Sequence, residues 1–456
     1  VTHVGPAPSY AGLAQRFDAQ QALSHMRVLT APEMEGRGPG TPGAEAAAAY
    51  IAARFAEYGL EPISPALGFR LPMTTQVVTP TAQPELALLD PTGQVICSFT
   101  YRADFGVDIH GHGGPGEANA PLAVLSFFKS SYDPREFKGL DLRGCIALYL
   151  VDQAPPGFAV EALIRGAVGI LVVDEDITPR LQLADPDQDY LRPPTLPIFR
   201  IHPTAADTLL APDGLSVEQL SKDAAQPLQD ERPWKMRQSS SRVHMRLALS
   251  PAQEVTTDSV LALFKGTDAT LNKQLVIVSA HYDGSGRQPD GTVLQSANDG
   301  VSGIAVMLEI LRLWTTRGFQ PRRTMLFAAW TGGEWEYSGA HEYLTAQAPY
   351  SVLQTMAVVN LNGLGCGSNE LFADGDAKLV DLLLRSAESS ISARKGKTRH
   401  HPYQTAFQAP SLTVGWGDDS IPPIDDNLDR INVFRLGEAG QAINLALITL
   451  SREYEY

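Results

Sequence analysis

The sequence has little cysteine and no long apolar run. Its three cysteines, Cys97, Cys145 and Cys366, are widely spaced along 456 residues, so they form no metal cluster and at most one disulfide. No apolar run approaches the roughly 20 residues that a membrane-spanning helix needs, and we expect no membrane span. These shortages argue against a cysteine-based metal module and a membrane-spanning helix in this sequence, and they leave the compartment open.

Positive charge is also scarce. The chain carries 36 Lys and Arg against 51 Asp and Glu, a net charge of −15. Nucleic acid and anionic membrane surfaces need a basic face, so we expect neither as a partner. The first residue is Val1 rather than Met, and we expect an extracellular or periplasmic protein after removal of a signal. With 44% hydrophobic and 19% charged residues, the composition is that of a globular protein of two or three domains.

Three apolar runs in the second half end abruptly in polar residues. The runs are residues 275–280, 324–330 and 356–361. They lead into His281 and Asp283, then Glu334, then Asn362. In an open parallel sheet the carboxyl ends of the strands share the edge where ligands bind. The sequence therefore predicts an active-site edge there.

Strands alternate with helices around these runs. Helices are expected at 301–316, 379–390 and 436–450, and the first has an apolar stripe at helical spacing. The alternation predicts an α/β fold with a doubly wound, mostly parallel sheet. Residues 112–245 differ: short apolar strands flank one helical stretch, and a polar Pro- and Ser-bearing segment at 226–242 is expected to be a return linker. We therefore expect one domain from 1–111 and 246–456, interrupted by a small α/β insert at 112–245.

The polar residues at the predicted edge suit a metal. An imidazole ligand needs a partner for its second nitrogen, and Asp283, two residues after His281, can provide it. Asp299 precedes a helix and could cap it, and Glu334 could be an ordinary loop carboxylate. Together on neighbouring strand ends, however, one imidazole and these carboxylates form a ligand set suited to zinc.

At this point the sequence resembles a known family, metallopeptidase family 28, the co-catalytic di-zinc exopeptidases that include bacterial leucyl aminopeptidases. Segments similar to this family are Gly36-Arg37-Gly38-Pro39-Gly40-Thr41-Pro42-Gly43 before an Ala-rich helix, Ala409-Pro410-Ser411-Leu412, and the stretch from Asp426 to Asn432. Residues 142–148 and 166–170 resemble the family's protease-associated insert domain. The resemblance implies a zinc-exopeptidase-like fold over nearly the whole chain.

The resemblance also implies site residues. In the family, one zinc takes a histidine, a bridging aspartate and a second aspartate. The other takes the bridge, a glutamate and a second histidine, and the glutamate before the ligand glutamate is the general base. His281 matches the first histidine, Asp299 the bridge and Glu334 the glutamate ligand.

The other three positions depart from the family pattern. The base position is Gly333, and the second aspartate is Asn362. The second histidine falls by spacing on Pro422, with Ser420 next nearest, and neither can replace an imidazole. The neighbouring groups available as substitutes are Glu336, Asp418, Asp419, Asp425, Asp426, His400 and His401. We expect solvated surface for each of them.

Two hypotheses follow, with a third behind them. The first is a degenerate member of the family that binds none or one zinc and keeps the fold for binding or assembly, with a protein or peptide as its partner. The transferrin receptor ectodomain and nicastrin are precedents in the family for this fold without peptidase activity. The second is an active metallopeptidase or amide hydrolase with a remodelled, mononuclear zinc site. The third is a metal-free lyase or cyclase. Glutaminyl cyclases share the fold, but they keep the base glutamate that Gly333 replaces.

Overall fold

The computed structural model describes residues 9–109, 113–128, 133–155, 157–177, 179, 196–224, 233–333, 338–345, 354–387, 391–396, 409–417, 421 and 423–455. The chain divides into two compact units. The first unit comprises 1–74, 255–288 and 292–456, and the second comprises 75–254 with 289–291.

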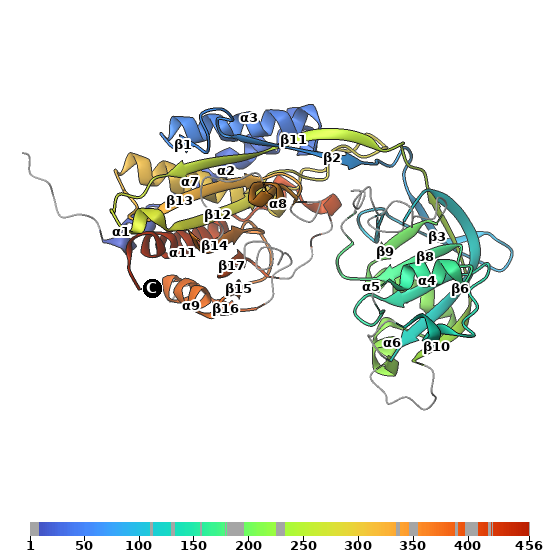
Figure 1. Ribbon diagram of the computed structural model, residues 1–456. Coiled ribbons are helices and arrows are strands. Elements are labelled where there is room, and N and C mark those ends of the chain that lie inside the picture. The colour runs from blue at the N-terminus through green and yellow to red at the C-terminus, as the bar shows by residue number, and fades with distance from the viewer. Residues whose placement is uncertain are drawn as a thin grey trace, which may run out of the picture. The chain divides into compact units, whose positions relative to one another are not determined.

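The first unit is built on a nine-stranded sheet in the order β1-β11-β13-β12-β14-β17-β15-β16, with β2 also paired to β11 (Figure 1). The strands are β1 Glu61–Pro62, β2 Arg70–Val77, β11 Gln253–Phe264, β12 Leu275–His281, β13 Thr324–Trp330, β14 Thr355–Leu361, β15 Leu371–Gly375, β16 Ala393–Lys395 and β17 Ser411–Gly415. The four central strands β13, β12, β14 and β17 are mutually parallel, so their carboxyl ends lie at one edge. The three predicted apolar runs are β12, β13 and β14.

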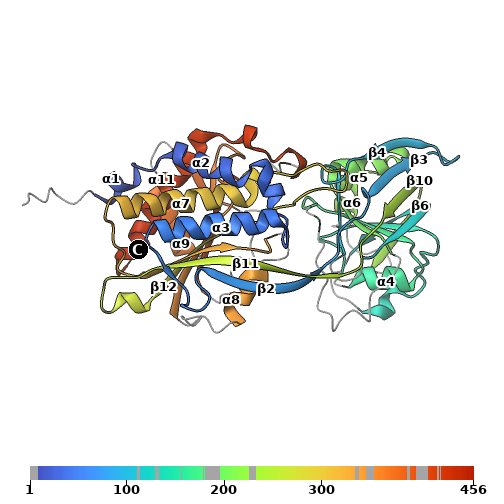
Figure 2. The same cartoon turned by 90° about the horizontal axis from the view of Figure 1, so that it is seen from above.

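Helices cover both faces of this sheet (Figure 2). They are α1 Tyr10–Ala14, α2 Ala19–Leu29, α3 Pro42–Glu57, α7 Ser302–Thr316, α8 Ser338–Thr345, α9 Ala377–Ser386 and α11 Val433–Arg452. Side chains of α1, α2, α3, α7, α9 and α11 share one core with the sheet, whereas α8 packs with Trp330 on the other face. The predicted α/β fold with a doubly wound sheet is confirmed. None of the helices in the described ranges combines the length and apolarity needed to cross a bilayer.

Local sequence explains the elements that support the site. Every residue of β12 and β13 is buried, as expected for central strands covered on both faces. Thr41 caps α3 by accepting a hydrogen bond from the Ala44 amide, and Pro42 takes the first helical position, where its missing N–H has no effect. These two residues fix the segment that leads into α3 from residues 32–37.

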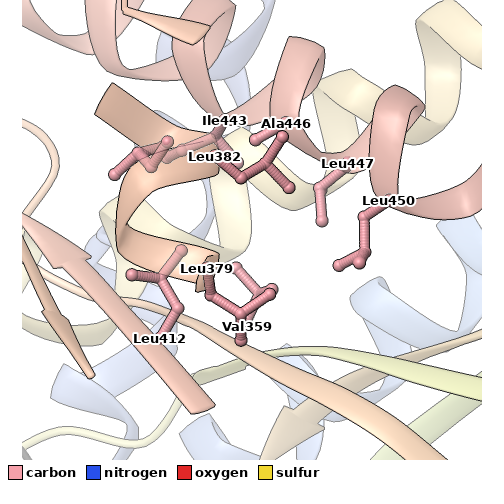
Figure 3. A pocket seen from close by; sticks show the side chains of 9 residues that line it. Val359, Leu379, Leu382, Leu412, Ile443, Ala446, Leu447 and Leu450 are labelled. Atoms are coloured by element: carbon pink, nitrogen blue, oxygen red, sulfur yellow. The ribbon is translucent and has the colours of Figure 1, made fainter. Parts of the chain in front are cut away.

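A small cavity lies in the core between α9, α11 and the strands β14 and β17 (Figure 3). Its volume is about 10 Å³, and all of its lining is aliphatic, including Val359, Leu382, Leu412 and Leu447. A space of this size holds at most one water, and an apolar cavity stays dry. We therefore interpret it as a packing feature of the core rather than a ligand site.

The second unit has its own eight-stranded sheet in the order β4-β3-β10-β6-β7-β8-β9-β5. Its strands and helices are β3 Glu85–Leu89, β4 Val95–Phe99, β5 Phe105–Val107, β6 Gly116–Phe127, β7 Ile146–Leu150, α4 Phe158–Ile164, β8 Gly169–Val173, β9 Ile198–Ile201, α5 Pro203–Leu210, α6 Val217–Ala224 and β10 Trp234–Leu247. Strands β6, β7, β8 and β9 run parallel, and apolar clusters form on both faces.

Two sequence expectations about this unit were wrong. The insert does not begin at 112 and end at 245, because β3 pairs with β10 and β5 with β9, which moves the boundaries to 75 and 254. The expected linker at 226–242 overlaps β10, a strand that joins β3 to β6. Its Ser-rich part, between Gln238 and Arg242, is an irregularity within the strand pairing rather than part of a linker.

Candidate metal-site residues at the carboxyl edge of the first sheet

His281 is the last residue of β12 and is almost fully buried, with 3% of its surface exposed. Its Nδ1 lies 3.2 Å from the Asp283 carbonyl oxygen and 3.5 Å from the Asp283 carboxylate. Asp283 therefore occupies the position predicted for it, behind the imidazole. Such a partner fixes the orientation of a histidine ring.

Asp299 reaches the opposite side of the same imidazole. Its Oδ1 lies 3.0 Å from His281 Nε2. It belongs to an irregular turn, Ala297–Val301, in which Gly300 has φ of +85°. Only glycine adopts this conformation readily, and it turns the Gly300 amide toward Asn362, whose Oδ1 accepts a hydrogen bond at 2.9 Å. The sequence predicted that His281, Asp299 and Glu334 converge beside Asn362. His281 and Asp299 are in contact and Asn362 accepts from the adjoining Gly300 amide, whereas Glu334 lies outside the described residues.

Gly333 follows β13 and lies against the imidazole. Its amide donates a hydrogen bond of 3.0 Å to the Asp283 carboxylate. A Cβ at this position would come closer than 3.0 Å to the Cγ and Nδ1 atoms of His281. The ring thus fills the space into which a side chain of residue 333 would start.

The electrostatics favour a charged imidazole. Burial alone would lower the pKa of His281, but the hydrogen bonds and negative charges of Asp283 and Asp299 outweigh it and raise the pKa well above its ordinary value. The ring can donate from both nitrogens, one to each acidic residue. A metal at Nε2 would have to displace that proton.

Asp426, considered as a substitute metal ligand, has a different role. Its two oxygens accept hydrogen bonds from the Asn298 amide at 2.7 Å and the Asp299 amide at 2.9 Å. Burial raises its pKa to about 6 against the lowering effect of these bonds. Both oxygens are engaged with the backbone of the Asp299 turn, so Asp426 holds this turn in place. Asp425 is half-exposed and pairs with Arg430 at 3.3 Å.

Asn298 is a structural residue of the site that the sequence reasoning missed. Its side-chain oxygen accepts hydrogen bonds from the amides of Gly365 at 2.8 Å and Cys366 at 3.0 Å. It thereby ties the Asp299 turn to the loop that follows Asn362. The only sequence feature that pointed to a role for Asn298 was its position directly before Asp299. Its hydrogen-bond partners could not be predicted, because they lie almost 70 residues away in sequence.

Several sequence predictions fall outside the described residues. They concern Glu334, Glu336, His400, His401, Asp418, Asp419, Ser420 and Pro422. The assignment of Glu334 as the glutamate ligand therefore stays a prediction.

The donor set can be compared with the needs of zinc. The described residues bring one imidazole, His281, and one carboxylate, Asp299, to a common point, and the Asn362 oxygen already accepts from Gly300. Protein zinc sites use three or four ligands. Within the described ranges, no group of three or more His, Cys, Asp or Glu is arranged to hold a metal. The described residues thus supply one imidazole and one carboxylate, and the predicted glutamate ligand, Glu334, lies outside them.

Comparison with known sequences identifies the class of protein. Residues 259–425 match the model of Peptidase family M28. Mouse transferrin receptor protein 2 is 30% identical over 150 residues, which cover 32% of this chain and 18% of that protein. The vacuolar membrane protease of Ajellomyces capsulatus is 29% identical over 140 residues, 31% of this chain and 12% of that protein. The matched region thus spans less than a fifth of the length of either relative.

Solved structures share the fold over nearly the whole chain. The aminopeptidase from Aneurinibacillus sp. strain AM-1 aligns with a TM-score of 0.66 at 17% identity, covering 98% of this chain and 97% of that one. The zinc aminopeptidase BSAP from Bacillus subtilis aligns at 0.56 and 19% identity, covering 96% of each chain. The structure is thus that of an aminopeptidase-fold protein. Together with the match of residues 259–425 to the family model, it confirms the resemblance to peptidase family M28.

Proposed function

We propose that this chain is an aminopeptidase-fold protein with a degenerate di-zinc site, and that it binds a protein or peptide without cleaving it. One observation carries the proposal. The base position is Gly333, and the His281 ring occupies the space where a side chain there would begin. General-base catalysis contributes about 10²–10⁴-fold to rate. Gly333 has no side chain to act as the base, and the His281 ring fills the space that such a side chain would need.

The remaining contacts support the same proposal. Asn362, at the position of the second aspartate, offers a neutral amide whose oxygen is engaged by Gly300. The His281–Asp299 pair is internally satisfied, since each residue serves as the other's partner at 3.0 Å. One sequence relative is named as a receptor, which accords with a binding role. The second unit, proposed as the protease-associated domain expected from the sequence, would add a further surface.

A second candidate is a metallopeptidase or amide hydrolase with a single zinc in a remodelled site. The observation in its favour is that His281, Asp299 and the supporting Asp283 keep the geometry of a zinc-binding histidine with its carboxylates. A vacuolar membrane protease among the relatives accords with this alternative. A third ligand would have to come from outside the described residues.

The test is hydrolysis of a panel of aminoacyl anilides in the presence of added zinc. The parent chain, the single variants Gly333→Glu, Asn362→Asp and Pro422→His, and the triple variant are compared. We expect no appreciable turnover by the parent or the single variants, because a metal-activated water, a base and charge stabilisation act as a unit. The triple variant supplies the complete set of side chains.

Strong zinc-dependent turnover by the parent would contradict the proposal and favour the mononuclear enzyme. His281→Ala is the matched control. It removes the histidine common to both hypotheses, so activity that survives this change comes from a contaminant.

A further inference from the structure

The segment Pro32–Arg37, ahead of α3, has an unusual backbone. Glu35, Gly36 and Arg37 have φ values of 47°, 70° and 56° in succession. Residues with a side chain rarely adopt this left-handed region, and such strain persists where the surrounding structure enforces it, often beside functional sites. The effect of the turn is to direct Arg37 into the interior, where its side chain is fully buried.

The Arg37 guanidinium contacts both loops of the candidate site. Its Nε donates to the carbonyl of Tyr282 at 2.7 Å, between His281 and Asp283. Its Nη2 donates to the carbonyls of Gln295 at 2.8 Å and Ser296 at 3.0 Å, just before the Asp299 turn.

Three further bonds complete the attachment. Arg37 Nη1 donates to the Leu29 carbonyl at the end of α2 at 2.5 Å. The backbone oxygens of Gly36 and Arg37 accept from the amides of Gly286 and Gly284, each at 3.2 Å. One segment therefore joins the histidine loop, the Asp299 turn and a helix of the core.

The Asp299 turn is held from its other side by Asp426. The carbonyls of residues 295 and 296, just before the turn, accept from the Arg37 cation, whereas the amides of residues 298 and 299 within it donate to the Asp426 carboxylate. Charged hydrogen bonds of this kind are about twice as strong as neutral ones. We infer that Arg37 is a positioning residue that, together with Asp426, fixes Asp299 against His281. The geometry of the His281–Asp299 pair is then set by contacts within the protein. This holds whether the site serves in binding or in hydrolysis.

The experiment compares Arg37→Lys with Arg323→Lys by amide hydrogen exchange of the full chain. Lysine keeps the positive charge. It replaces the planar guanidinium, which donates through three nitrogens, with a single ammonium that cannot donate to all four backbone carbonyls at once. Arg323 is a matched control, because it is also buried (2% exposed) and donates to the carbonyl of Leu450 and the side chain of Gln274.

For Arg37→Lys we expect exchange at the amides of Gly284, Gly286, Asn298 and Asp299 to accelerate by about 10-fold to 100-fold, with smaller changes in α11. The His281 Nε2–H signal in ¹⁵N spectra should shift with them, which a general loss of stability would not cause. Arg323→Lys should leave both readouts unchanged. The inference would be overturned if Arg37→Lys accelerated amide exchange uniformly along the chain or left exchange in the site loops unchanged. It would also be overturned if Arg323→Lys accelerated exchange at the same four amides.

Asp426→Asn provides a second test that does not depend on Arg37→Lys folding. The amide side chain can accept only through its oxygen, so exchange at Asn298 and Asp299 should accelerate while Gly284 and Gly286 keep their rates. Unchanged exchange at Asn298 and Asp299 would show that Asp426 does not hold the turn and would overturn the inference.

Discussion

Placing a side chain at Gly333 tests whether the His281 ring fills the space beside residue 333. A Cβ there would lie closer than 3.0 Å to the ring. The ring has little room to retreat, because Asp299 holds its Nε2 at 3.0 Å and Gly300 is so close that a Cβ added there would lie 2.7 Å from the ring's Cε1. Overpacking of this kind costs about 1–3 kcal/mol. We therefore expect Gly333→Ala to destabilise the first unit by that amount, and Gly333→Glu to destabilise it further because a carboxylate would enter beside buried Asp283.

The matched control is Gly437→Ala. This glycine lies within α11, and an added Cβ would make only an ordinary 3.4 Å contact with Ala19. Alanine there should stabilise the helix by about 0.5–1 kcal/mol. The assay is the urea midpoint of the first unit, read from its peptides by pulsed hydrogen exchange, since a chain of two units need not unfold in one step. A neutral or stabilising Gly333→Ala would refute the reasoning and show that the site can admit a base.

Two further predictions concern the core of the first unit. Burial, together with the charges of Arg54 and Arg312, lowers the pKa of His25 from 6.5 to about 4, so the unfolded chain binds this proton more tightly than the folded one. The free energy of unfolding should therefore fall as the pH falls from 6.5 to 4, by up to about 3 kcal/mol, and His25→Gln should flatten this dependence in urea titrations. Leu447→Ala should enlarge the cavity between α9 and α11 and lower the free energy of unfolding by about 2–5 kcal/mol. If the urea midpoint changed little, the interpretation of the cavity as a packing feature would be ruled out.

The sequence predicted the elements with strong local patterns. β13 was predicted at 324–330 because a continuous apolar run bounded by polar residues is typical of a central strand. α7 began one residue later than expected, because Asp299 and Gly300 form an irregular turn in place of a simple cap. Pairing partners were not predictable, since short strands such as β3 and β5 carry no local sign of the sheet to which they belong.

Part of the site could be predicted from the sequence, and part could not. His281 and Asn362 come at the ends of the neighbouring parallel strands β12 and β14, and the Asp299 turn contacts both residues. The roles of Arg37 and Asp426 depend on contacts across 245 and 128 residues of sequence, which no local pattern reveals. Asp426 was named among the groups that could replace a lost ligand and was expected to be solvated surface, but it is buried. The structure shows that backbone amides use both of its oxygens.

The central claim is that the site no longer assembles a di-zinc centre. The most direct measurement is the metal content of the full chain, purified without chelator and equilibrated with excess zinc before desalting. With His281 and Asp299 as the described donors, we predict none or one zinc per chain. Two tightly held zinc ions per chain, both lost in His281→Ala or Asp299→Asn, would contradict the account and identify a working aminopeptidase centre.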